Sequence, residues 1–193
     1  MSRPNAESKP DPWRSPVVVA QIPETGLHRK LEASAAERQG MAELAGLREV
    51  LSAQADLLIV PKSGGRYEVT GRVHARIGQT CVVTLDPIEN EIDEEVDLVF
   101  APEAEARRLA DLIEEGQDDE EPPEAVDAPE PITNGIIDLG RVATDALFLA
   151  IDPYPRKDGA VFEAEVTAPD PEDHPFAALK ALQDNKKGRK KGK

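Results

Sequence analysis

The chain of 193 residues contains a single cysteine, few aromatic side chains (4%) and no long apolar run. One cysteine excludes an intramolecular disulfide framework and is typical of a reducing compartment. The uncharged apolar runs, such as Leu57–Val60, are far too short to cross a bilayer, and the N-terminal residues lack the apolar stretch of a secretory signal. We therefore expect a cytoplasmic protein without a membrane partner, whose core is built from valine, leucine, isoleucine and alanine.

Signatures of common enzyme and metal sites are missing as well. The chain has no nucleophile elbow, no dinucleotide-binding glycine pattern and no Walker sequence, and Lys62–Gly65 has the wrong spacing for a phosphate-binding loop. The three histidines, His28, His74 and His174, have no partner at metal-ligand spacing. We expect a protein that is not an enzyme, with no catalytic residue, no cofactor and no metal.

Cys81 has two interpretations. Alternation from Val73 through Ile77 places it on the core face of a strand, unless Gly78 carries a bulge that reverses the faces. A buried lone cysteine behaves as a small apolar residue, and no lysine or histidine adjacent in sequence would lower the pKa of its thiol. The structural interpretation is favoured over a nucleophile, which would make the protein a hydrolase.

Negative charge dominates the chain, whose formal net charge is −15. The last nine residues, Asn185–Lys193, carry six basic side chains and no acid, so the residues before them carry −21. Nine acids, no base and several prolines lie between Glu114 and Glu130, which predicts an acidic linker over 114–131. A protein with this much negative charge repels a phosphate backbone in general and can approach one only through local basic features.

Apolar periodicity predicts the fold class. Alternation by twos indicates strands joined by hairpin turns, and spacing by three and four indicates helices, the first of them opened by a Ser34/Glu37 capping box. We expect strands within 17–20, 51–60, 67–85 and 95–100, and helices that begin near Ser34, Pro102, Leu139 and Pro175. The fold class is α+β: a mainly antiparallel sheet or partly closed barrel, with three packed helices and a short C-terminal helix.

The chain is expected to hold one domain with extended ends. Residues 1–15 are rich in proline and polar side chains and are predicted to be a flexible leader. Residues 16–152 form the single α+β domain, interrupted by the acidic linker. Residues 153–193 form an extended C-terminal segment that carries the short helix and the basic tail.

A basic stripe on the central strand, Arg72, His74 and Arg76, also has two interpretations. Its arginines suit contact with phosphates. Alternatively, the stripe pairs across strands with acids at alternate positions of the next strand, each pair contributing about 0.2–1 kcal/mol. These acids are Glu91, Asp93, Glu95 and Asp97. With so many acids nearby, the structural pairing is favoured.

The basic tail is the main candidate for contact with nucleic acid, because no acid near it in sequence neutralises it. Its charged residues are Lys186, Lys187, Arg189, Lys190, Lys191 and Lys193. It has no aromatic side chain to stack on bases, so it would bind without reading sequence. The alternative is a solubilising end, or a tail that folds back on the acidic linker.

Three stretches carry a family resemblance when they are taken together in this order: QTCVVTLDPIENEIDEEVDLVF, IIDLGRVATDALFLAIDPYPRK and HPFAALKAL. From about Val17 to Leu182 the chain resembles the YceD family, the large ribosomal RNA subunit accumulation proteins. The resemblance implies a non-enzymatic bacterial protein. Many members have a second cysteine three residues after the Cys81 position and a cysteine cluster after the later helix, as in a metal site. In this chain the position of the second cysteine is Thr84, and the segment after the later helix is DPYPRKDG, which has no cysteine. No metal ligand is therefore carried over from the family.

The resemblance and the charge distribution together imply two alternative functions. The first is a factor that supports accumulation or processing of large-subunit ribosomal RNA and ribosome biogenesis. Its tail would contact that RNA or a pre-ribosomal particle, and its acidic domain would bind a partner such as a basic ribosomal protein. The alternative is an acidic protein-binding chaperone or adaptor with no RNA contact.

Overall fold

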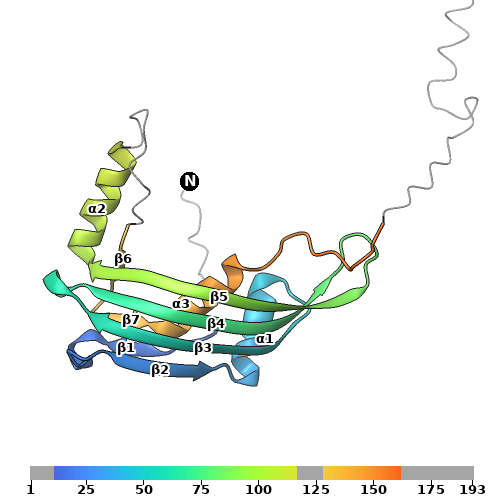
Figure 1. The fold of residues 1–193 in the computed structure, drawn as a ribbon, viewed down its shortest axis with the longest axis horizontal. Helices are drawn as coiled ribbons and strands as arrows, with labels where there is room; N and C mark the ends of the chain where they lie inside the picture. Colours follow the sequence, from blue (N-terminus) through green and yellow to red (C-terminus); the bar gives the residue numbers. More distant parts are fainter. Residues whose placement is uncertain (1–10, 117–127, 162–193) are drawn as a thin grey trace, which may run out of the picture. The chain divides into compact units, whose positions relative to one another are not determined.

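The computed structural model describes residues 11–116 and 128–161. The chain divides into two compact units at Ala160, and the described residues lie almost entirely in the first. They form a five-stranded sheet and a separate two-stranded ribbon, with helices beside them (Figure 1). The strands are β1 (Pro16–Val18), β2 (Leu27–Glu32), β3 (Glu49–Pro61), β4 (Tyr67–Thr80), β5 (Pro87–Pro102), β6 (Glu130–Ile132) and β7 (Ile136–Asp138). The helices are α1 (Ala35–Ala45), α2 (Glu103–Gly116) and α3 (Leu139–Leu149), with short 3-10 turns η1 (Val19–Gln21) and η2 (Ser63–Gly65).

The sheet has the order β2-β3-β4-β5-β6. Strands β2 to β5 are antiparallel to their neighbours, whereas β6 runs parallel to β5 and pairs only with Phe100–Pro102. Strands β1 and β7 form the antiparallel ribbon, in which Val17 faces Ile137. The α+β class is confirmed. Of the two forms that the sequence allowed, the open sheet is the one formed, because β2 and β6 are not paired to close a barrel.

The first helix begins and ends where its sequence indicates. The Ser34 side chain accepts from the Glu37 backbone N–H, and the Glu37 carboxylate accepts from the Ser34 backbone N–H, so the capping box is formed. Gly46 ends the helix in the left-handed conformation, with φ of 66°.

The two central strands approach each other closely at Gly71. This glycine faces Leu57 in the pairing of β3 with β4, and its φ is 153°. A Cβ atom at this position would lie 2.0 Å from the carbonyl oxygen of Asp56. Only a residue without a side chain fits the centre of the sheet here.

Helices α1 and α3 cover one face of the sheet and enclose the core (Figure 1). The alternation predicted for β3, β4 and β5 is observed, because their inward residues are buried: Ala53, Ala55, Leu57, Ile59, Val73, Ala75, Ile77, Ile92, Val96 and Phe100. Leu51 was expected on the same face. The structure buries Val50 instead, since the pairing register shifts between Val50 and Ser52.

The ordered domain starts earlier than predicted. The leader was expected to extend to Ser15, yet Trp13 is only 2% exposed and belongs to the core. Burying its indole removes a large apolar area from water, which explains why this polar, proline-rich stretch packs on the domain. Residues 1–10 of the predicted leader lie outside the described residues.

The predicted linker and C-terminal segment also have different ends. The linker was predicted for 114–131, but residues 114–116 belong to helix α2 and residues 130–131 to β6. Residues 117–127 of the predicted linker lie outside the described residues. Residues 153–157 pack on the domain, because the backbone N–H of Val82 donates to the carbonyl oxygen of Pro155. The helix predicted from Pro175 lies outside the described residues.

Candidate functional site

The face of the sheet opposite the helices is charged. Strand register places Arg72 opposite Glu95, His74 opposite Asp93 and Arg76 opposite Glu91. Arg72 donates to Asp93 at 2.7 Å and lies 3.6 Å from Glu95. Hydrogen bonding to Asp93 raises the pKa of Arg72.

Arg76 and His74 are also paired. The guanidinium of Arg76 donates to Glu89 at 2.6 Å, two residues from Glu91, which lies opposite Arg76 in the register. His74 lies 3.3 Å from Asp93. Both candidate arginines therefore face carboxylates of β5. This arrangement favours the structural interpretation of the stripe, since a phosphate would have to displace these carboxylates and approach the remaining acids of β5. The six charged residues of the basic tail lie outside the described residues.

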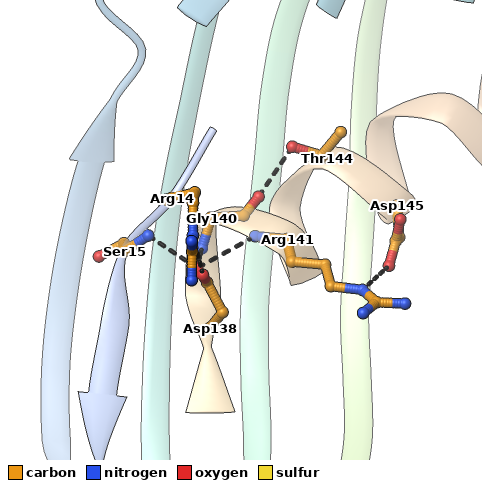
Figure 2. A network of polar contacts seen from close by, with 7 residues as sticks. All are labelled: Arg14, Ser15, Asp138, Gly140, Arg141, Thr144 and Asp145. Carbon is orange, nitrogen blue, oxygen red and sulfur yellow. Dashed lines mark hydrogen bonds and ion pairs between the residues drawn. The ribbon is translucent and has the colours of Figure 1, made fainter. Parts of the chain in front are cut away.

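Asp138, at the start of α3, is the centre of a polar network (Figure 2). Its Oδ1 accepts the backbone N–H groups of Ser15 at 2.7 Å, Gly140 at 3.1 Å and Arg141 at 3.4 Å. Its Oδ2 accepts Nε of Arg14 at 3.2 Å. The carboxylate thus caps the helix and holds residues 14–15 beside it, which is a structural use of the group.

Gly140 allows this close approach. A Cβ atom there would lie 2.6 Å from the carbonyl oxygen of Trp13, so the chain before β1 can cross α3 only over a glycine. One turn later, Thr144 donates its hydroxyl to the Gly140 carbonyl oxygen at 2.8 Å (Figure 2). The DLG sequence at the start of α3 therefore provides the cap (Asp138), a buried apolar side chain (Leu139) and the crossing point (Gly140).

A groove of about 580 Å³ lies beside this network, between β5, α3 and the segment from β6 to β7. Its apolar lining includes Val96, Leu98, Phe100, Ile136, Val142, Ala146 and Leu149. Seven carboxylate side chains and only two arginines also line it. Arg14 pairs with Asp138 and Arg141 with Asp145 at 3.5 Å, so the arginines are already engaged. The groove combines apolar surface with excess negative charge.

Cys81 lies in the turn between β4 and β5 and is fully buried, as its position in the alternation predicted. Its sulfur accepts the backbone N–H of Thr84 at 3.4 Å and that of Lys157 at 3.3 Å. The ammonium of Lys157 binds Asp86 at 3.0 Å. The structure thus brings the DPYPRKDG segment onto the turn that contains Cys81.

These contacts change the chemistry expected of the thiol. Hydrogen bonds from the Thr84 side chain, the Lys157 backbone and the Thr84 backbone lower the pKa of Cys81 from 9.0 to about 6, against the opposing effect of burial. The sequence predicts no such lowering, because no lysine or histidine is adjacent to Cys81. Backbone N–H groups supplied by the fold stabilise the thiolate instead.

The surroundings of Cys81 do not fit a metal. The position three residues later is Thr84, and the later segment contributes a backbone N–H and a lysine that binds Asp86, none of which is a metal ligand. Within residues 11–116 and 128–161, no three histidine, cysteine or acidic side chains are grouped as a metal would need. One thiolate alone does not form a zinc site.

The lowered pKa predicts a pH dependence of stability. A thiol whose pKa is lower in the folded state stabilises the fold fully above pH 9, and this stabilisation is lost as the pH falls through about 6. The difference in unfolding free energy between the native protein and a Cys81→Ala variant should therefore grow from pH 6 to pH 9. Urea unfolding at several pH values measures this difference, and a difference that stays constant would contradict the lowered pKa of Cys81.

A Thr84→Val variant tests the cause of the lowering. Because it removes the side-chain hydrogen bond to the sulfur, titration of the thiolate absorbance should give a higher pKa for Cys81.

None of the helices in the described part of the chain combines the length and apolar composition that crossing a bilayer requires.

The described residues thus form an α+β domain with charged and grooved surfaces, in which the network around Asp138 supports the fold. A protein-family model, the large ribosomal RNA subunit accumulation protein YceD, matches residues 69–183. The chain belongs to the YceD family. The family's description names a role in accumulation and no reaction. Comparison with curated proteins and with solved structures found no match.

The groove is the feature that sequence reasoning missed. The sequence shows the alternating acids of β5 but predicts for them only a pairing with the basic stripe of β4. Whether its other edge is covered depends on the sheet order, which no local pattern gives.

Proposed function

We propose that the protein is a cytoplasmic, non-enzymatic factor that supports accumulation of large-subunit ribosomal RNA and thereby ribosome biogenesis. The observation that carries this proposal is the family match, which covers 115 residues from β4 through most of the C-terminal segment. A protein of this kind acts by binding, and the chain offers two oppositely charged features for it: the acidic domain and the basic tail.

Deleting the gene should lower the ratio of large-subunit to small-subunit ribosomal RNA in the bacterium that encodes it, and the full-length protein should restore the ratio. Quantifying both RNAs in the deletion and complemented strains measures this. An unchanged ratio in the deletion strain would refute the proposed function. Complementation by Cys81→Ala would exclude the hydrolase interpretation of Cys81.

The tail is the part that we propose contacts RNA. Its six positive charges sit at the end of a chain whose remainder carries −21, so the tail can approach phosphates that the body repels. Arg72 and Arg76 remain secondary candidates, since their guanidinium groups face Asp93 and Glu89. Any contact they make with phosphate would have to displace these partners.

Binding of large-subunit ribosomal RNA should weaken steeply with salt through the tail. About six phosphate contacts to single-stranded RNA predict that log K falls with log salt concentration at a slope of about −4. A chain that ends at Asp184 should bind far more weakly or with a flatter slope. Filter binding of the full-length and the shortened chain at several salt concentrations measures the binding constant K and its salt slope for each.

Two further variants control for charge and length. Replacing the six basic tail residues by glutamine keeps the length of the chain and should weaken RNA binding as much as removing the tail does. Replacing the exposed Arg107 and Arg108 of α2 by glutamine changes the net charge elsewhere and should leave the slope unchanged. A slope that the tail variants do not alter would contradict RNA binding by the tail.

The alternative function, a protein-binding chaperone or adaptor without RNA contact, is favoured by one observation. The groove beside β5 is apolar, negatively charged and close to the IIDLGR stretch. If neither the full-length nor the shortened chain binds RNA, while deletion still lowers the RNA ratio, the effect on ribosomal RNA passes through a protein partner.

A further inference from the structure

Strand β5 has an open edge along the groove. Its residues from Pro87 to Phe100 pair with β4: Pro87 lies opposite Thr80 at one end, and Phe100 lies opposite Tyr67 at the other. On its other side, among the described residues, only β6 pairs with it, and this pairing starts at Phe100. Among the residues that the structure describes, the outward-facing backbone N–H and C=O groups between Glu94 and Val99 therefore have no strand partner, as the addition of a strand requires.

The groove places apolar side chains next to this edge. Val96 and Leu98 point to the helix-covered face of the sheet and line the groove, and Leu149 of α3 lies on its other side with 87% of its surface exposed. Ile136, also in the lining, is 38% exposed. Exposed apolar side chains gathered beside an unpaired strand edge are typical of a surface that binds a peptide.

The charge around the edge is negative on both faces of the sheet. Glu94 lies on the same face as Val96, whereas Glu95 and Asp97 lie on the opposite face. Within the described residues, no ion pair involves Glu94 or Asp97, and Glu95 has only the 3.6 Å contact with Arg72. Asp11 and Glu130 add carboxylates at the rim. A peptide that enters the groove must compensate these charges.

We propose that the open edge of β5 binds an extended segment of a partner protein in which lysine or arginine alternates with apolar residues. Side chains alternate between the two faces of a strand, so an added strand would place its apolar residues beside Val96 and Leu98. Its cationic residues would lie beside Glu95 and Asp97 on the other face. Main-chain hydrogen bonds supply the pairing, and the alternation supplies the specificity.

The other possible occupants fit less well. The chain's own tail, Asn185–Lys193, is cationic but has no apolar side chain for the groove. The stretch 117–129 is acidic and contains three prolines, which lack the N–H that pairing needs. A second copy of β5 would bring Glu95 and Asp97 of both chains together, and like charges at this distance repel.

This inference does not depend on RNA binding by the tail. A basic ribosomal protein is one partner with the required chemistry. Binding of such a protein in the groove would be a second activity within the proposed function, beside RNA binding by the tail. Loss of peptide binding and loss of RNA binding can be measured separately on the same chain.

A labelled octapeptide that alternates lysine and valine is the probe for this site. Fluorescence anisotropy should detect its binding to the full-length protein, and hydrogen exchange should show that the amides of β5 between Glu94 and Val99 become protected. A Glu95→Lys/Asp97→Lys variant should bind at least about tenfold more weakly, because it reverses the charge beside the edge. Both side chains are exposed, so the fold should be retained, which thermal unfolding checks.

The matched control reverses two charges away from the groove. Glu24→Lys/Glu43→Lys has the same net charge as the test variant, and both positions are exposed and outside the lining. It should bind the peptide as the native protein does. The shortened chain that ends at Asp184 should also keep its affinity, which separates this site from the tail.

Four results would overturn the proposal. Absence of peptide binding would mean that the acids only protect the edge from aggregation. Equal binding of a glutamate–valine peptide would remove the role of charge. Equal binding of a peptide with N-methylated valines would exclude strand addition, because methylation removes the N–H donors. Competition by a peptide of Asn185–Lys193 at equal affinity would make the chain's own tail the occupant.

Discussion

Replacing Gly71 by alanine should lower the free energy of unfolding by about 4 kcal/mol, which is near the upper end of the range for single substitutions. The new Cβ would lie 2.0 Å from the carbonyl oxygen of Asp56, and this oxygen belongs to the paired backbone of β3. The strands must separate at the centre of the sheet to accept it. Urea unfolding of the two proteins measures the loss.

Gly64→Ala is the control that separates the steric clash at Gly71 from the free-energy cost of placing alanine at a positive φ. Gly64 also has a positive φ, 77°, but nothing lies within 4 Å of its Cβ position. We expect it to cost about 1 kcal/mol, the usual cost of the left-handed conformation for alanine. If both substitutions had the same effect, the close approach of β3 and β4 at Gly71 would be refuted.

Asp138→Ala should cost about 3 kcal/mol. It removes the helix cap and leaves the Ser15 backbone N–H without its acceptor, and each loss has a cost of about 1–2 kcal/mol. Both ends of the domain depend on this carboxylate, so the loss should appear in a single unfolding transition. Thermal or urea unfolding measures it.

Asp138→Asn is the informative control. All three backbone N–H groups donate to Oδ1, whose place the amide oxygen of asparagine can take, and only the bond from Arg14 to Oδ2 is lost. Since the Arg14 side chain is 65% exposed, this variant should cost less than about 1 kcal/mol. An asparagine variant as unstable as the alanine variant would show that the negative charge itself is required.

Local sequence patterns predicted the helices α1 to α3 and the strands β3 and β4, but they missed β2 and β6 and gave only the 95–100 part of β5. The capping box at Ser34, the alternation in β3 to β5 apart from Leu51, and the burial of Cys81 each depend on a few neighbouring residues, and each is confirmed. The positions that failed depend on distant partners. Trp13 sits in a polar stretch that looks like a leader, and only the core that it reaches reveals its role.

The candidate sites were harder to predict for the same reason. The pKa of Cys81 is set by backbone N–H groups, one of them from Lys157, 76 residues further along the chain. The groove exists because β6 covers only the last three residues of β5, a consequence of sheet order. Composition identified negative charge, but charge without topology does not locate a surface.

The bond between Ser15 and Asp138 joins residues 123 positions apart, and β1 pairs with β7 over a similar separation. During synthesis, the N-terminal segment must therefore wait until nearly the whole domain has been translated. Trp13 has no core to enter before α3 is complete, and contacts this distant in sequence slow folding. A ribosome that stalls before Asp138 would hold a chain with its N-terminal aromatic side chain exposed, a form on which chaperones and proteases act.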